Sequence, residues 1–155
     1  MTLEQTISAI RPLDEKSMTA ARNRFANIAM PLGGLGLLQD AIVQLAVILG
    51  QPVPDISRRA AVVFCADNGV VAEGVTQCGQ EVTATVAENM GRGESTVCLM
   101  AKHLGMDVFP VDIGVAQPIK SEKVLQFAVR RGTANFAHEP AMTREEALEA
   151  VEIGI

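Results

Sequence analysis

The sequence predicts an α/β chain in which amino-terminal helices are followed by part of a parallel sheet flanked by helices. Three observations favour this class. The first 50 residues carry apolar side chains at helical spacing. A β-branched apolar run over residues 60–65 ends abruptly in Ala66-Asp67-Asn68-Gly69. From Arg58 onward, strand-like runs alternate with helical patterns, as they do in proteins with parallel sheets.

Residues 1–55 form the first predicted segment, which contains two helices and a linker. Asp14 fits the N-cap of the first helix, whose apolar positions are Met18, Ala21, Phe25 and Ile28. The apolar positions of the second helix are Leu35, Leu38, Ile42, Leu45 and Leu49. The glycines of residues 33–36 follow a helix rather than a strand, so we interpret them as a helix-to-helix turn with a glycine N-cap and not as a nucleotide loop. Two prolines within residues 50–55 predict a linker.

Residues 56–155 form the second predicted segment, the first part of an α/β domain that binds substrate. We expect strands over residues 60–65, 106–113 and 124–129, and helices over residues 81–90 and 95–104. Pro110 indicates a bulge or an edge within the second strand. Thr143 and Glu146 form a capping box that starts a last helix. No strand follows that helix, which favours the first half of a larger, doubly wound enzyme; a complete small α/β protein is the alternative.

Composition excludes several classes of function. The net charge is −5 and no basic patch is present, so we expect no nucleic-acid partner. No apolar run is long enough to span a membrane and no signal peptide begins the chain, so we expect a cytoplasmic protein without membrane partners. Three scattered cysteines and two distant histidines form no metal set, and no cofactor is expected.

Polar residues at the ends of the first two strands predict a small-molecule site. Asp67 follows the first strand and Asp112 ends the second, and parallel strands bring their carboxyl ends to one edge of the sheet. Asp67-Asn68-Gly69 is equally a strong turn signal. Asp112 could support the site or could simply cap the next turn.

The sequence also resembles the nicotinate-nucleotide:dimethylbenzimidazole phosphoribosyltransferase family over nearly all of its length. The motifs that carry the resemblance are Pro31-Leu-Gly-Gly-Leu-Gly36, Ala66-Asp67-Asn68-Gly69-Val70, Glu73-Gly74-Val75, Glu81-Val82-Thr83, Asn89-Met90, Val111-Asp112-Ile113-Gly114, Arg131-Gly-Thr-Ala-Asn135 and Pro140-Ala141-Met142-Thr143. Their order and spacing fit the family throughout. Members of the family are longer, and this chain resembles their amino-terminal portion.

The resemblance implies transfer of the phosphoribosyl group of nicotinate mononucleotide to a ring nitrogen of dimethylbenzimidazole or a related base, in assembly of the nucleotide loop of cobalamin. It also implies a homodimer. Family members carry their general-base glutamate and their glycine-rich phosphate loop in the second half of the chain. We therefore expect no catalytic residue here, only part of the acceptor-base pocket, and no activity from this chain alone.

The resemblance places the substrate-binding residues at Asp67, Asn68, Cys78, Val82, Val86 and Asp112. Cys78 stands where the family usually has a serine, and Val86 stands where a glutamine often faces the base. Both differences remove hydrogen-bonding capacity, since a thiol is only a weak donor. Asn68 likewise replaces a common histidine. These departures suggest a paralogue with a different acceptor base. A standalone base-binding or regulatory module on the same scaffold is a separate, non-enzyme alternative.

Overall fold

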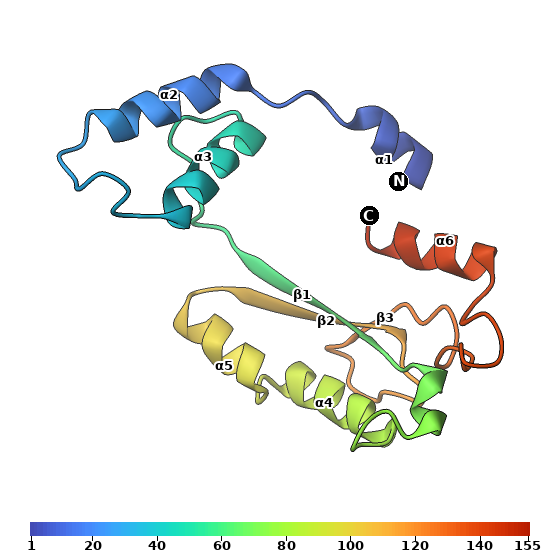
Figure 1. Cartoon of the computed structure of the whole chain (residues 1–155). Helices are drawn as coiled ribbons and strands as arrows, with labels where there is room; N and C mark the ends of the chain where they lie inside the picture. The colour runs from blue at the N-terminus through green and yellow to red at the C-terminus, as the bar shows by residue number, and fades with distance from the viewer. The chain divides into compact units, whose positions relative to one another are not determined.

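The computed structural model describes residues 1–155 and divides them into two compact units. The helical unit comprises residues 9–58, and the sheet unit comprises residues 1–8 and 59–155. Figure 1 labels the elements of both units. The predicted α/β class is confirmed, since helices accompany a three-stranded parallel sheet. No helix in residues 1–155 combines the length and the apolarity that a membrane crossing requires.

The helical unit contains α2 (Glu15–Ala26) and α3 (Leu37–Leu49), which pack against each other. The predicted N-cap is confirmed, because the Asp14 carboxylate accepts a hydrogen bond from the Lys16 N–H. Gly36 is the N-cap of α3, as predicted for the glycine turn. Leu35 precedes α3 instead of lying in it, because Gly33 and Gly36 adopt positive φ values of 68° and 49° and interrupt the helix there. A small core joins the two helices through Met18, Ala21, Phe25, Val43 and Ala46.

The sheet unit has the strand order β1-β2-β3, with every pair parallel. Its elements in chain order are α1 (Leu3–Ala9, whose last residue belongs to the helical unit), β1 (Ala60–Ala66), the 3-10 helix η1 (Gly69–Glu73), α4 (Glu81–Arg92), α5 (Thr96–His103), β2 (Asp107–Gly114), β3 (Leu125–Gln126) and α6 (Arg144–Ile153). The capping box predicted at the start of α6 is present between Thr143 and Glu146. The third strand is much shorter than residues 124–129.

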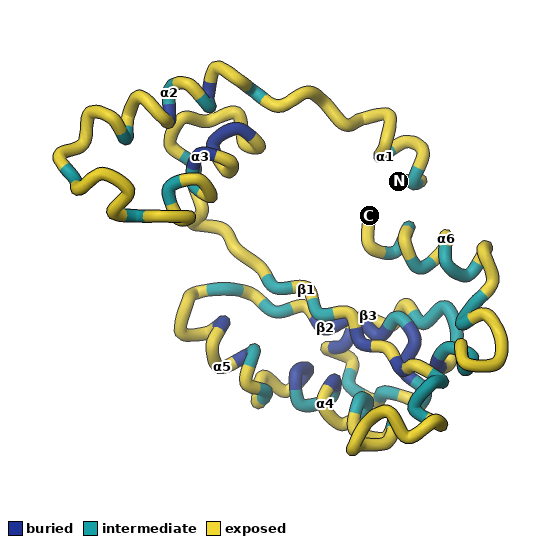
Figure 2. Tube along the Cα trace, in the orientation of Figure 1, coloured by how far each residue is buried: buried dark blue, intermediate teal, exposed yellow.

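The core of the sheet unit lies between one face of the sheet and the helices α4 and α5 (Figures 1 and 2). Val63, Cys65 and Val108 supply the sheet side. The helices supply Ala84, Ala87, Met90, Val97 and Cys98. Burial raises the pKa of the Cys65 thiol, and the nearby Asp112 carboxylate adds to that shift. Cys65 and Cys98 are therefore packing residues, as their apolar sequence context predicts.

Pro110 does not mark an edge strand, because β2 is the central strand and Pro110 is buried in it. The reason is the direction of its nitrogen. The carbonyl of Asp112 faces β3, where it accepts a hydrogen bond from the Phe127 N–H (2.9 Å). Backbone groups two residues apart face the same side of a strand, so the Pro110 nitrogen also faces β3. That strand pairs only with Val111 and Asp112, and the missing N–H breaks no ladder bond.

Candidate functional site

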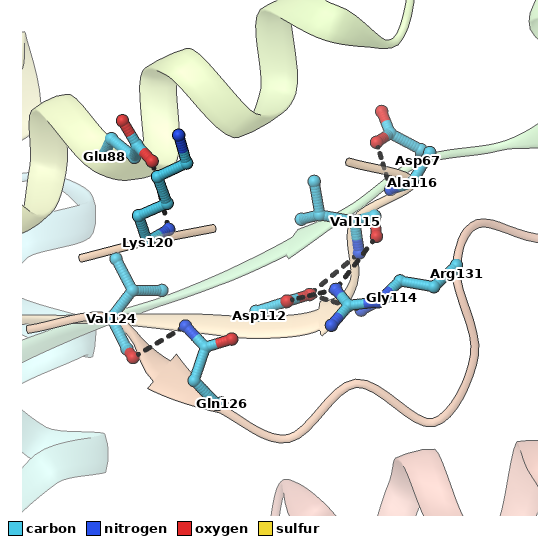
Figure 3. A network of polar contacts seen from close by, with 10 residues as sticks. All are labelled: Asp67, Glu88, Asp112, Gly114, Val115, Ala116, Lys120, Val124, Gln126 and Arg131. Atoms are coloured by element: carbon cyan, nitrogen blue, oxygen red, sulfur yellow. Dashed lines mark hydrogen bonds and ion pairs between the residues drawn. The ribbon is translucent and has the colours of Figure 1, made fainter. Parts of the chain in front are cut away.

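The carboxyl edge of the sheet is held together by Asp67, which follows β1. Its side chain is buried, and its carboxylate accepts hydrogen bonds from Thr83 Oγ1 (2.6 Å) and from the Ala116 N–H (2.8 Å). Its backbone N–H donates to the Gly114 carbonyl (3.0 Å), and its carbonyl accepts from the Thr133 N–H (2.9 Å). A single residue therefore joins α4, the loop after β2 and the loop after β3 to the end of β1, and Figure 3 shows its bond to Ala116.

Asp112 organises the turn that follows β2. Its side chain is fully buried, and one carboxylate oxygen accepts from the N–H groups of Gly114 (3.1 Å) and Val115 (2.8 Å). The other oxygen lies 2.9 Å from Nη1 of Arg131, which points toward it in Figure 3. A buried charge is tolerated when it is paired and its lone pairs are satisfied, and Arg131 provides that pairing. These hydrogen bonds confirm that Asp112 caps the next turn, whereas its support of a substrate site stays a prediction.

Gly69 allows two loops to touch through their backbones. Its N–H donates to Thr133 Oγ1 (3.1 Å). A Cβ atom at position 69 would lie 2.6 Å from the Thr133 carbonyl oxygen, closer than side-chain atoms approach in proteins. The loop after β1 and residues 131–135 therefore form one wall of the edge, and only glycine permits this contact.

A small apolar pocket opens at the same edge, on the side of the sheet that carries α6. Its volume is about 100 Å³. It is lined by the strand ends at Ala66 and Gly114, by Gly132 and Thr133 from the following loop, and by Glu146 and Ala150 of α6. Glu146 also pairs with Arg130 at 3.3 Å, which fixes the rim. The ends of the first two strands, the segment after β3 and α6 thus enclose this space, at the edge of the sheet where open α/β proteins bind ligands.

The six predicted binding residues fall into two groups. Asp67 and Asp112 are buried, and their carboxylates already have partners within the chain. Asn68, Cys78, Val82 and Val86 are exposed. Asn68 accepts a hydrogen bond at its carbonyl from Gln80 Nε2 (3.1 Å), which holds the loop before α4 close to the end of β1.

Val82 and Val86 lie one turn apart on α4, so their side chains share one surface of that helix. They are 40% and 43% exposed, so the two valines present an apolar surface on one face of α4. Thr83 lies between them in sequence and binds Asp67, so the contact that orders the edge also fixes the start of this valine surface. Cys78 is an exposed thiol in the loop that leads into α4.

Sequence reasoning missed Thr83, Thr133 and Arg131. Each is joined to one of the two aspartates across 16 or more residues of chain, apart from any local pattern. The available signals were two motifs of the family resemblance: Glu81-Val82-Thr83 contains Thr83, and Arg-Gly-Thr-Ala-Asn contains Arg131 and Thr133. No group of three or more His, Cys, Asp or Glu side chains in residues 1–155 is placed to hold a metal ion.

The sequence of this chain is similar to a family of known enzymes. A family model described as a phosphoribosyltransferase matches residues 10–155. The nicotinate-nucleotide–dimethylbenzimidazole phosphoribosyltransferase of Acetivibrio thermocellus is 42% identical over 99% of this chain and 44% of its own length. The enzyme of the same name from Clostridium acetobutylicum is 39% identical over 100% of this chain and 44% of its own length.

A crystal structure bearing that enzyme name, from Thermus thermophilus, superposes with a TM-score of 0.81 at 38% identity. The superposed region covers 88% of this chain and 42% of the chain in the crystal structure. The chain thus spans less than half the length of the relatives that it matches, and corresponds to their amino-terminal part.

We predict that Asp67→Ala lowers the free energy of unfolding by about 2–4 kcal/mol, because the Ala116 N–H and the Thr83 hydroxyl lose their acceptor. Asp67→Asn keeps one acceptor oxygen and should cost roughly half as much. Urea denaturation measures both values. The control is Asp107→Ala at the exposed start of β2, which should stay within about 0.5 kcal/mol of the parent. Equal stability of Asp67→Ala and the control would contradict the assigned role.

Proposed function

The chain belongs to the phosphoribosyltransferase family whose model spans residues 10–155, and from this membership we propose that it forms the amino-terminal part of an enzyme that transfers phosphoribosyl groups. The donor is nicotinate mononucleotide and the acceptor is dimethylbenzimidazole or a related base, as the names of its relatives state for those proteins. We place the reaction in assembly of the cobalamin nucleotide loop. The observation that carries the proposal is the match over almost the whole chain in both sequence and structure.

In this reaction a ring nitrogen of the base attacks C1 of the ribose, and the bond from C1 to the nicotinate nitrogen breaks. Nicotinate leaves with the electron pair of that bond, and the acceptor loses a proton to a general base. The resemblance assigns the general-base glutamate and the phosphate loop to the second half of family members. Residues 1–155 therefore contribute an ordered wall of the site, built on Asp67 and Asp112.

We propose that the acceptor base contacts Cys78, Val82 and Val86. A flat heteroaromatic ring gains from apolar contact, and the two exposed valines of α4 offer such a surface next to the ordered edge. Asn68 bounds the same region through its contact with Gln80. The thiol and the valine donate and accept hydrogen bonds poorly, so the preferred acceptor is less polar or differently shaped than in relatives that have serine and glutamine there.

We further propose that the complete enzyme is a cytoplasmic homodimer. Its partners are small molecules, with no nucleic acid or membrane among them. The acidic net charge of −5 agrees with the absence of a nucleic-acid partner. A standalone base-binding or regulatory module on the same scaffold is the alternative. Such a module would bind the base and transfer nothing.

Nicotinate release distinguishes these possibilities. We expect no nicotinate when residues 1–155 alone receive nicotinate mononucleotide and dimethylbenzimidazole. A chimera of this chain with the remaining part of the Acetivibrio thermocellus enzyme should release nicotinate when both substrates are present. Circular dichroism verifies that the chimera is folded. Turnover by the chain alone, or a folded chimera that binds base but never releases nicotinate, would overturn the proposal.

Restoring polar groups should change the acceptor preference. In the chimera, we expect Cys78→Ser with Val86→Gln to raise kcat/KM for dimethylbenzimidazole relative to a less polar acceptor by roughly three- to tenfold, the worth of one hydrogen bond. Competition between the two acceptors measures this ratio. Leu99→Gln is the matched control, since Leu99 is an exposed apolar residue on α5 and outside the proposed contact. A ratio that moves equally in both variants would show that Cys78 and Val86 do not contact the base.

A further inference from the structure

One peptide bond at the ordered edge joins an asparagine to a glycine. Asn68-Gly69 is the only Asn-Gly pair in the sequence, which contains no Asp-Gly pair. An asparagine side chain is most reactive before glycine, because glycine has no Cβ to shield its own backbone nitrogen from the neighbouring amide. Only the local conformation then opposes attack by that nitrogen.

The reaction of such a pair is deamidation. The Gly69 nitrogen gives its proton to hydroxide and attacks Cγ of Asn68. A C–N bond forms there, the side-chain amide bond breaks, and ammonia leaves with a proton taken from water. A water molecule then opens the cyclic imide at either of its two carbonyl carbons. The product at position 68 is aspartate or isoaspartate, each with one added negative charge, and no oxidant or reductant takes part.

Burial does not protect the Asn68 side chain. Asn68 is exposed, and its side chain makes no capping hydrogen bond to η1. Water and hydroxide therefore reach the amide in the folded chain. Any protection must come from the backbone on either side of the peptide bond.

The polar groups of the Asn68–Gly69 peptide unit all have partners. The Gly69 N–H donates to Thr133 Oγ1 (3.1 Å). The Asn68 carbonyl accepts from Gln80 Nε2 (3.1 Å) and from the Val71 N–H (3.2 Å). Because the Gly69 proton must leave before the nitrogen can attack, the bond to Thr133 has to break first.

The conformation of Asn68 also opposes closure of the imide ring. A five-membered ring requires the Gly69 nitrogen to lie nearly eclipsed with Cβ of Asn68. With φ −109° and ψ 126°, Asn68 is extended, and the nitrogen is turned well away from Cβ. Rotation about ψ would move Gly69, which is packed so closely that a Cβ there would lie 2.6 Å from the Thr133 carbonyl oxygen. The reactive geometry therefore requires residues 131–135 to move away.

We propose that Asn68-Gly69 is a deamidation site that its contact with Thr133 keeps unreactive, and that local release of residues 131–135 activates it. Loops open at a lower free energy than the whole domain, so the reaction proceeds through the opened segment of an otherwise folded chain. The modification is independent of the proposed phosphoribosyl transfer.

Deamidation would remove the ordered edge permanently. Isoaspartate adds one methylene group to the main chain directly before Gly69. Residues 133–135 approach that glycine too closely for even a Cβ atom, so the longer backbone does not fit against them. Because ammonia is lost, refolding does not reverse the change.

Peptide mapping by mass spectrometry measures the reaction directly. Residues 1–155 are incubated at mildly alkaline pH, either folded in buffer or unfolded in guanidinium chloride. The aspartyl and isoaspartyl peptides that contain position 68 are followed with time. We expect deamidation to be at least tenfold slower in the folded chain, since only the opened fraction reacts. No substrate is present, so the result bears on the modification and not on the proposed reaction.

Substitutions at Thr133 test the protecting contact. Thr133→Val removes the acceptor of the Gly69 N–H with little change of shape, and should speed deamidation of the folded chain about tenfold, the worth of that hydrogen bond. Thr133→Ser keeps the hydroxyl and should react as slowly as the parent. Thr76→Val is the matched control, because the Thr76 hydroxyl accepts from the Cys78 N–H (3.4 Å) in the nearby loop. Circular dichroism verifies that each variant is folded.

Hydrogen exchange at the Gly69 amide decides the matter if Thr133→Val fails to fold. The same opening exposes this amide and permits the attack, so in the unsubstituted chain its protection should be of the same order as the slowing of deamidation. The proposal is overturned if position 68 stays intact in the unfolded chain or if the folded chain reacts at the unfolded rate. It is equally overturned if the Gly69 amide is unprotected, or if folded Thr133→Val reacts no faster than Thr133→Ser.

Discussion

The hydrogen bonds of the Asp67 carboxylate are the constraint on which the functional edge depends. A buried carboxylate is stable only when donors surround it, and here the donors come from α4 and from the loop after β2. Meeting that requirement brings together segments that are 16 and 49 residues away in sequence. Asp112 applies the same principle one strand further along, with Arg131 as its charge partner. The edge is thus organised by contacts within the chain itself.

This organisation agrees with our proposal that residues 1–155 form one part of a longer enzyme. The core between the sheet and the helices α4 and α5 is closed, whereas the opposite face and one strand edge are open. The buried aspartates hold the strand ends and the following loops together, and their carboxylate oxygens already accept hydrogen bonds within the chain. In our proposal, residues 1–155 provide the ordered loops and a binding surface for the base. The rest of the enzyme provides the groups that react.

The helices and strands were largely predictable from local sequence signals. The contacts between residues far apart in the sequence were not. The apolar run of β1, the Asp14 N-cap and the Thr143–Glu146 capping box depend on neighbouring residues, and all three are present. Pro110 was misinterpreted because the sequence does not show which neighbour its nitrogen faces. The Asp112–Arg131 ion pair was missed because it joins residues from separate elements. The predicted binding residues divide into two buried and four exposed side chains, a distinction that the residue types alone do not make.

The most direct test of the central claim is amide chemical-shift mapping by NMR while residues 1–155 are titrated with dimethylbenzimidazole. If the Asp67-centred edge and the valine surface of α4 form the acceptor site, the largest shifts fall on residues 67–69 and 78–86. Shifts centred on the helical unit, residues 9–58, or no shift at saturating base, would contradict the account.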